Sequence, residues 1–110
     1  MSHDCSFLTD VLDESQVSFG DSDRSEHAGD WGTPEPMQVT PDAVVWPEST
    51  EDVSAVLSAA NEREIPVTPY AAGTSLEGNA TPAFEGISMD LMRMNDVLAV
   101  RADDFQIDVQ

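Results

Sequence analysis

The chain of 110 residues contains no lysine, and its only basic side chains are four arginines against 22 acidic residues. Binding to a nucleic-acid backbone requires cations that neutralise phosphates, so this composition argues against a DNA or RNA partner. An anionic membrane surface is disfavoured for the same reason. No apolar run approaches the ~20 residues of a membrane-spanning helix, so no integral membrane segment is expected.

Cysteine is nearly absent too, since Cys5 stands alone and no internal disulfide can form. A single thiol suits a reducing compartment, and Met1–Asp4 offers no basic start for a signal peptide, so a cytoplasmic location is expected. His3 and Cys5 are too few ligands for a metal. The acidic stretch from Asp21 begins like a calcium loop but has Glu26 at the position that requires glycine, so no metal site is predicted.

The acidic residues that give the net charge of −18 are dispersed along the chain. An acidic interaction tail would concentrate them, whereas no run here reaches five like charges. Adaptation to high salt explains the dispersal better, because the Debye length falls to ~3 Å at 1 M and repulsion between carboxylates is screened. A halophilic protein is therefore the favoured interpretation.

Apolar periodicity divides the chain into two parts, predicted as residues 1–36 and 37–110. In the first part, Phe7, Leu8, Val11 and Leu12 mark one face of a short helix. Glycine and proline interrupt residues 20–42, which are predicted as a loosely ordered acidic loop with His27 exposed.

The second part reads as strand, helix, strand. Residues 43–46 form a continuously apolar run typical of a strand that is buried on both faces. Ser49 is placed to cap a helix with its apolar stripe at Val53, Val56, Leu57 and Ala60. Residues 67–70 form the next strand. Such a unit predicts an α/β fold with parallel strands.

Three more strands are predicted at residues 87–91, 97–100 and 105–109. The first would bring the parallel sheet to about three strands, and the last two alternate like the start of an antiparallel sheet. The final strand runs into Gln110 without a turn or cap, so a truncated N-terminal piece of a larger fold is expected.

The segment from Pro69 to Asn79 is the one candidate site. Small residues follow a strand there, so backbone N–H groups can approach a ligand closely, and such a concave run of amides suits a diphosphate. It is neither a Walker A loop nor the G-x-G-x-x-G fingerprint. From spacing alone, an ordinary connection rich in small residues remains the alternative.

Four ordered segments carry a resemblance to a known family. Residues 43–53 resemble the opening of the FAD-binding domain named after p-cresol methylhydroxylase (PCMH-type) and shared with vanillyl-alcohol oxidase. Residues 66–79 resemble its D-lactate and glycolate dehydrogenase branch, and residues 87–95 and 105–110 follow in the expected order. The resemblance implies an FAD-dependent oxidoreductase fold and favours the diphosphate loop over the ordinary connection.

By that resemblance, the loop cradles the FAD diphosphate mostly through backbone amides. The cofactor-binding candidates are Tyr70, Ala71, Ala72, Gly73, Thr74, Ser75, Gly78 and Asn79. Relatives often have glycine at positions 71 and 72, where this chain has alanine, which tolerates positive φ poorly. No histidine lies between residues 28 and 110, so non-covalent FAD is implied.

The family reaction removes hydrogen from a 2-hydroxy acid and delivers hydride to the flavin. The substrate ligands and the catalytic base lie beyond this part of such enzymes, so no catalytic residue is predicted here, and the substrate would require the missing downstream domains. Two alternatives stay open: a non-catalytic module that binds nucleotide or docks onto a partner, and a truncated remnant without function.

Overall fold

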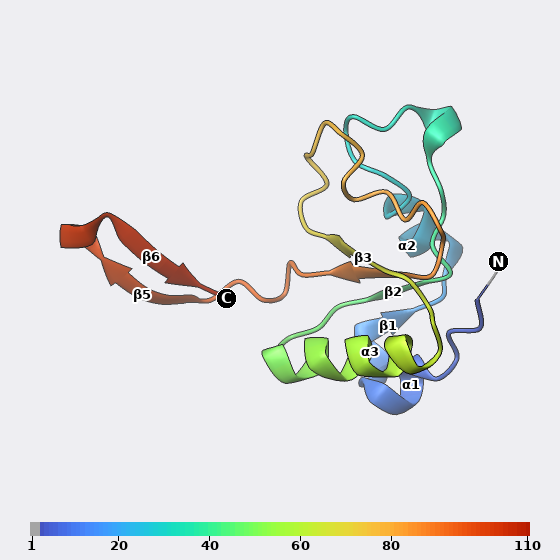
Figure 1. Cartoon of the computed structure of the whole chain (residues 1–110), viewed down its shortest axis with the longest axis horizontal. Coiled ribbons are helices and arrows are strands. Elements are labelled where there is room, and N and C mark those ends of the chain that lie inside the picture. The colour runs from blue at the N-terminus through green and yellow to red at the C-terminus, as the bar shows by residue number, and fades with distance from the viewer. Residues whose placement is uncertain (1–2) are drawn as a thin grey trace.

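The computed structural model describes residues 3–110 and divides them into a packed body and a projecting hairpin (Figure 1). The body contains a four-stranded sheet in the order β1-β2-β4-β3, formed by Val17–Ser18, Ala43–Val45, Ile87–Asp90 and Val67–Tyr70. Strands β2, β4 and β3 are parallel, whereas β1 pairs with β2 in the antiparallel sense. The predicted α/β class with three parallel strands is confirmed.

Helix α3, Thr50–Glu62, connects β2 to β3. The Ser49 hydroxyl accepts a hydrogen bond from the Asp52 N–H at 3.1 Å, which confirms the predicted N-cap. Val56 and Ala60 face the core, but Leu57 remains 45% exposed, so the buried stripe is narrower than the apolar spacing predicts. The strands that α3 connects are not neighbours, because β4 lies between them.

The core lies between the sheet and the helices. The buried core side chains come from the N-terminal segment, β2, α3 and the residues after it, and β4: Cys5, Leu8, Leu12, Ala43, Val45, Val56, Ala60, Ile65, Ile87 and Met89. Strand β2 is fully buried along its length, as its continuous apolar run predicts. Leu8 and Leu12 bring the short helix α1, Leu8–Val11, into this core, so the predicted N-terminal helix is confirmed.

The loop predicted for residues 20–42 is only partly correct. Its first turn forms helix α2, Asp21–Glu26, and a short 3-10 helix forms at Glu35–Met37. The segment is attached to the sheet by polar contacts rather than by an apolar stripe. The Arg24 side chain, for example, donates to the Pro41 carbonyl at 2.8 Å. The boundary predicted between residues 36 and 37 stays a prediction.

The hairpin consists of β5, Val97–Arg101, and β6, Gln106–Val109, joined by a 3-10 turn at Ala102–Asp104. Cross-strand pairing places Val97 opposite Val109 and Val100 opposite Ile107, so these four side chains share one face. Each of them is 57–69% exposed. Arg101 and Asp108 form an ion pair between the two strands. The hairpin therefore presents an uncovered apolar face.

Candidate cofactor-binding site

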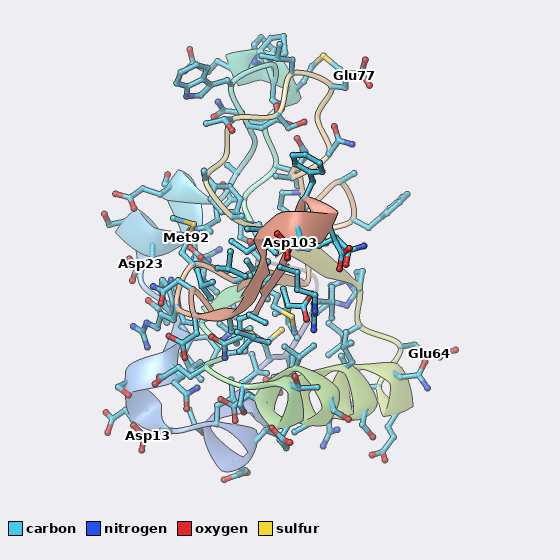
Figure 2. All side chains as sticks on the ribbon, turned by 90° about the vertical axis from the view of Figure 1, so that its left-hand side faces the viewer. Asp13, Asp23, Glu64, Glu77, Met92 and Asp103 are labelled. Atoms are coloured by element: carbon cyan, nitrogen blue, oxygen red, sulfur yellow. The ribbon has the colours of Figure 1, made fainter. Side chains whose placement is uncertain are left out.

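The predicted cofactor loop leaves the sheet at the carboxyl end of β3 and returns to it at β4. In α/β sheets, ligands bind where parallel strands end, so the position suits a nucleotide. The loop rises beside residues 30–38 at the top of Figure 1, and in Figure 2 Glu77 lies at its outer end. All eight predicted site residues lie at the end of β3 or in this loop.

The backbone of the loop is arranged to present N–H groups. Gly73 and Gly78 adopt positive φ values of 69° and 78°, whereas Ala71 and Ala72 do not, so alanine is compatible with both positions. Within residues 3–110, the N–H groups of residues 71–79 donate no hydrogen bond to another part of the chain. A run of such amides can bind an anion through its partial positive charges.

Tyr70 supports the turn from below. A Cβ atom on Gly73 would lie 2.2 Å from the Tyr70 hydroxyl oxygen, so the close approach of these two residues requires glycine. The hydroxyl donates to the Glu26 carbonyl at 3.3 Å, which links the turn to α2. Burial raises the pKa of Tyr70, and the negative charges of Asp90, Glu26 and Asp30 raise it further, so the phenol stays protonated at neutral pH.

Two predicted residues interact inside the loop. The Ser75 hydroxyl donates to the Asn79 side-chain oxygen at 2.6 Å and so closes the curve between them. Thr74 is exposed, and no contact within the described residues occupies its hydroxyl. The donor set thus consists of amides and a hydroxyl without a cationic side chain, and it fits an oxygen-rich, non-covalently held group.

His27 lies behind the loop and corrects the expectation that it is exposed. Its side chain is buried, with Nε2 2.8 Å from Asp90 Oδ2 and Nδ1 2.7 Å from the Asp23 carbonyl. Its ring also packs against Tyr70 with centroids 4.4 Å apart. Sequence reasoning missed this role because no local pattern brings residue 27 to the end of β4.

A second set of residues that sequence reasoning missed lies between β1 and β2. The N–H groups of Trp31 and Gly32 donate to the carbonyls of Gly73 and Ser75 at 3.0 and 3.1 Å. Residues 20–42 are therefore part of the architecture around the site. Glycine at positions 29 and 32 was the only signal in the sequence, and it equally indicated an ordinary turn.

Two further features were sought among residues 3–110, a metal-type cluster and a membrane-spanning helix. Residues 3–110 contain no group of three His, Cys, Asp or Glu side chains placed to hold a metal ion. No helix in this range is both long and apolar enough to cross a bilayer.

The family described as "FAD binding domain" matches residues 41–110. This range begins just before β2 and includes the whole loop. The chain belongs to the FAD-binding domain family. The match confirms FAD as the cofactor, and it includes every residue predicted to contact the diphosphate. Together with the relatives and the solved structures described next, it confirms the PCMH-type resemblance.

Sequence relatives of this FAD-binding chain carry names of hydroxy-acid enzymes. A D-lactate dehydrogenase of Archaeoglobus fulgidus is 47% identical over 60 residues, which cover 54% of this chain and 13% of the relative. A glycolate oxidase subunit of Bacillus subtilis is 28% identical over 93 residues, which cover 84% of this chain and 20% of the relative. This chain thus spans a fifth or less of these two proteins.

Solved structures share the fold. An alkyldihydroxyacetonephosphate synthase superposes with a TM-score of 0.81 over 94% of this chain and 23% of its own, at 22% identity. A p-cresol methylhydroxylase superposes with a TM-score of 0.64 over 86% of this chain and 19% of its own, at 18% identity. At such identities the likeness concerns the fold alone.

Proposed function

We propose that residues 70–79 bind the diphosphate of FAD and that the chain is the diphosphate-binding part of a flavin-dependent 2-hydroxy-acid dehydrogenase. The observation that carries this proposal is the run of N–H groups at residues 71–79 that donate to no other part of the described chain. The names of the D-lactate and glycolate relatives support the substrate class.

The roles of the individual residues follow from the geometry. Gly73 and Gly78 allow the backbone to curve, since both adopt positive φ. The amides between them, together with the Thr74 hydroxyl, would donate to phosphate oxygens. Tyr70 fixes the start of the curve from beneath Gly73. When bound, the flavin would accept the hydride that leaves the hydroxy acid, and this chain would orient the cofactor.

Catalysis would require protein that this sequence does not contain. The chain spans 13% and 20% of two of its relatives, and the exposed apolar face of the hairpin offers a surface for further protein. We therefore place the substrate ligands and the catalytic base outside residues 1–110. A cytoplasmic location and the absence of a nucleic-acid partner belong to the same proposal.

The test is a titration of the 110-residue chain with FAD in molar KCl, followed by flavin fluorescence. Gly73→Ala places a Cβ against Tyr70 at a positive φ, and we expect it to weaken FAD binding by about tenfold or more. Gly20→Ala is the matched control, since its φ of −69° and its nearest contact of 3.4 Å tolerate a Cβ.

Competition identifies the part of FAD that is bound. ADP carries the diphosphate and should displace FAD, whereas riboflavin lacks it and should not. Displacement by riboflavin alone would contradict a diphosphate cradle, and equal affinity of Gly73→Ala and the unchanged chain would move the site elsewhere.

Cooperative unfolding of the chain would argue against the functionless remnant, and FAD binding would argue against a module that only docks onto a partner.

A further inference from the structure

Residues Ala28–Thr33, termed here the clamp segment, lie outside the part of the chain that matches the FAD-binding family. They nevertheless contact the cofactor loop along its length. Trp31 N–H donates to the Gly73 carbonyl at 3.0 Å, and Gly32 N–H donates to the Ser75 carbonyl at 3.1 Å. The loop is thus held by a strip of chain that lies between β1 and β2 in the sequence.

These two bonds determine where the amides of the loop point. In a trans peptide unit, the carbonyl and the following N–H point in opposite directions. Because the carbonyls of Gly73 and Ser75 face the clamp segment, the N–H groups of Thr74 and Leu76 face away from it. The clamp segment therefore exposes alternate amides on the outer side of the loop, where a diphosphate would bind.

Gly32 makes the closest approach. A Cβ atom at this position would lie 2.0 Å from the Leu76 carbonyl oxygen and 2.5 Å from its Cα. Both are backbone atoms of the loop, so no side-chain rotation could relieve the overlap. The contact therefore requires glycine at position 32, although its φ is not in the positive region.

Asp30 and Thr33 hold the clamp segment in shape. The Asp30 Oδ1 atom accepts from Gly32 N–H at 3.0 Å and from the Thr33 hydroxyl at 2.8 Å. The Thr33 and Thr81 hydroxyl oxygens are 2.9 Å apart, which ties the clamp segment to the far end of the loop. Both Asp30 and Thr33 are buried, so water does not replace these bonds easily.

The charge on Asp30 is compatible with this role. Burial by itself would raise its pKa, but hydrogen bonds, above all from the Thr33 hydroxyl and also from Gly32 N–H, outweigh that effect and hold the pKa below its ordinary value. The carboxylate is thus ionised at neutral pH. Its Oδ1 atom accepts from Gly32 and Thr33, whereas its Oδ2 atom is buried with no hydrogen-bond partner among the described residues.

We propose that Ala28–Thr33 is a positioning segment that presets the cofactor loop, so that Gly32 and Thr33 determine FAD affinity without touching FAD. The proposal rests on the assignment of FAD to residues 70–79. It extends the determinants of cofactor binding to a part of the chain that precedes the matched domain.

The first measurement is amide hydrogen exchange of the 110-residue chain without FAD. The Trp31 amide should be protected in the unchanged chain and should lose about tenfold or more of its protection in Gly32→Ala. Gly20→Ala is again the control and should keep that protection within about twofold. The Leu91 amide, which donates to the Tyr70 carbonyl in the sheet, should stay protected in both variants and so reports that the fold is retained.

The second measurement is FAD affinity. Gly32→Ala should weaken binding by about tenfold, and Thr33→Val, which removes the hydroxyl but keeps the shape, should weaken it by about threefold to tenfold. Thr33→Ser retains the hydroxyl and should restore the affinity. The contrast between valine and serine isolates the hydroxyl, and continued protection of the Ile87 amide, which donates to the Pro66 carbonyl, shows that the sheet is retained in both variants. This pair also decides the matter if Gly32→Ala does not fold.

The outcomes separate the two proposals. If Gly73→Ala weakens FAD binding but Gly32→Ala and Thr33→Val do not, the clamp is wrong and the loop remains the FAD site. If Gly73→Ala has no effect, the loop assignment fails, and the inference fails with it. If the Trp31 amide of the unchanged chain exchanges without protection, the clamp segment does not hold the loop before FAD binds, and the proposal is wrong even if FAD binds.

Discussion

His27 Nε2 lies 2.8 Å from Asp90 Oδ2, and both side chains are buried although they are 63 positions apart in the sequence. The pair joins the C-terminal end of α2 to the last residue of β4. Asp90 also accepts from Met92 N–H at 2.9 Å through its other oxygen. Both oxygens of the carboxylate are thus hydrogen-bonded at the carboxyl end of β4, beneath the cofactor loop.

Replacement of His27 by alanine should destabilise the fold by about 3 kcal/mol, because it leaves the buried Asp90 Oδ2 without its partner and removes packing from Tyr70. The free energy of unfolding measured in urea would check this value. His3→Ala provides the matched control, since the hydrogen bond between that ring and the Phe84 carbonyl is long, at 3.3 Å, and exposed to solvent. Equal unfolding midpoints for His27→Ala and His3→Ala would contradict a structural role for the pair.

Cys5 should make stability depend on alkaline pH. Burial raises the pKa of its thiol from 9.0 to about 11, and the charges of Asp42 and Asp4 add to the effect. Above pH 9.0 the unfolded chain loses this proton while the folded chain keeps it, so the free energy of unfolding falls as the pH rises through the window up to about 11.

Comparison with Cys5→Ala isolates this contribution, because every other titrating group is common to both proteins. The stability difference between the two chains should narrow from pH 8 to pH 10.5, as followed by thermal unfolding. Iodoacetamide should also react slowly with the native thiol near pH 8. A constant stability difference with rapid alkylation would show that Cys5 is accessible.

The apolar periodicity of the sequence predicts the strands and the helix of the body, but it does not predict the order of the strands in the sheet. The continuous apolar run at 43–46 predicts β2, and the spacing of Val56 and Ala60 predicts the buried stripe of α3. Nothing local in the sequence says that β4 inserts between β2 and β3. Strand order depends on which edges meet in space, and the loop between β3 and β4 is long enough to permit either arrangement.

The sequence likewise predicts one part of the candidate site and misses another. Small residues after a strand identify the loop itself, since their function depends on backbone amides and local curvature. The clamp segment and His27 could not be predicted, because they act through single polar contacts with residues more than 40 positions away. A buried polar residue in an acidic stretch has no apolar neighbours that reveal its burial.

Salt should stabilise this protein and strengthen its binding of FAD. Labelled acidic side chains lie on different sides of the molecule in Figure 2, at Asp13, Asp23, Glu64, Glu77 and Asp103. With a net charge of −18, repulsion opposes both folding and the approach of an anionic diphosphate. Since the Debye length is only ~3 Å at 1 M salt, raising KCl from about 0.1 M to about 3 M should raise the unfolding temperature.

The same increase in KCl should lower the Kd for FAD, which is opposite to the usual weakening of charge-driven nucleotide binding by salt. Calorimetry of unfolding and the fluorescence titration would check the two effects. A comparison of sodium sulfate with KCl at matched ionic strength separates two effects of salt. Equal effects of the two salts indicate charge screening, whereas a larger effect of sulfate indicates its exclusion from the protein surface. Indifference of both quantities to salt would contradict the halophilic interpretation.

Removal of the hairpin should leave the body intact. Its apolar face is exposed, and the hydrogen bond that ties its end to the body is long: the Gln110 side chain donates to the Glu48 carbonyl at 3.4 Å. A chain that ends at Asn95 should therefore unfold cooperatively, with a free energy within about 0.5 kcal/mol of the full chain.

Amides of β5 and β6 in the full chain should exchange quickly, because an isolated two-stranded hairpin is marginally stable in water. Chemical denaturation of the two chains and hydrogen exchange of the longer one would check both expectations. Loss of the cooperative transition in the shorter chain would show instead that the hairpin supports the core.

The central place of β4 has a consequence for how the protein is made. Both β2 and β3 pair with β4 and not with each other, yet β4, Ile87–Asp90, is the last of the sheet strands to be synthesised. Until it leaves the ribosome, the earlier strands lack the partner that joins them, and the cofactor loop has no second anchor. Folding of the body therefore waits for the nascent chain to pass residue 90, and it then closes several long-range contacts together.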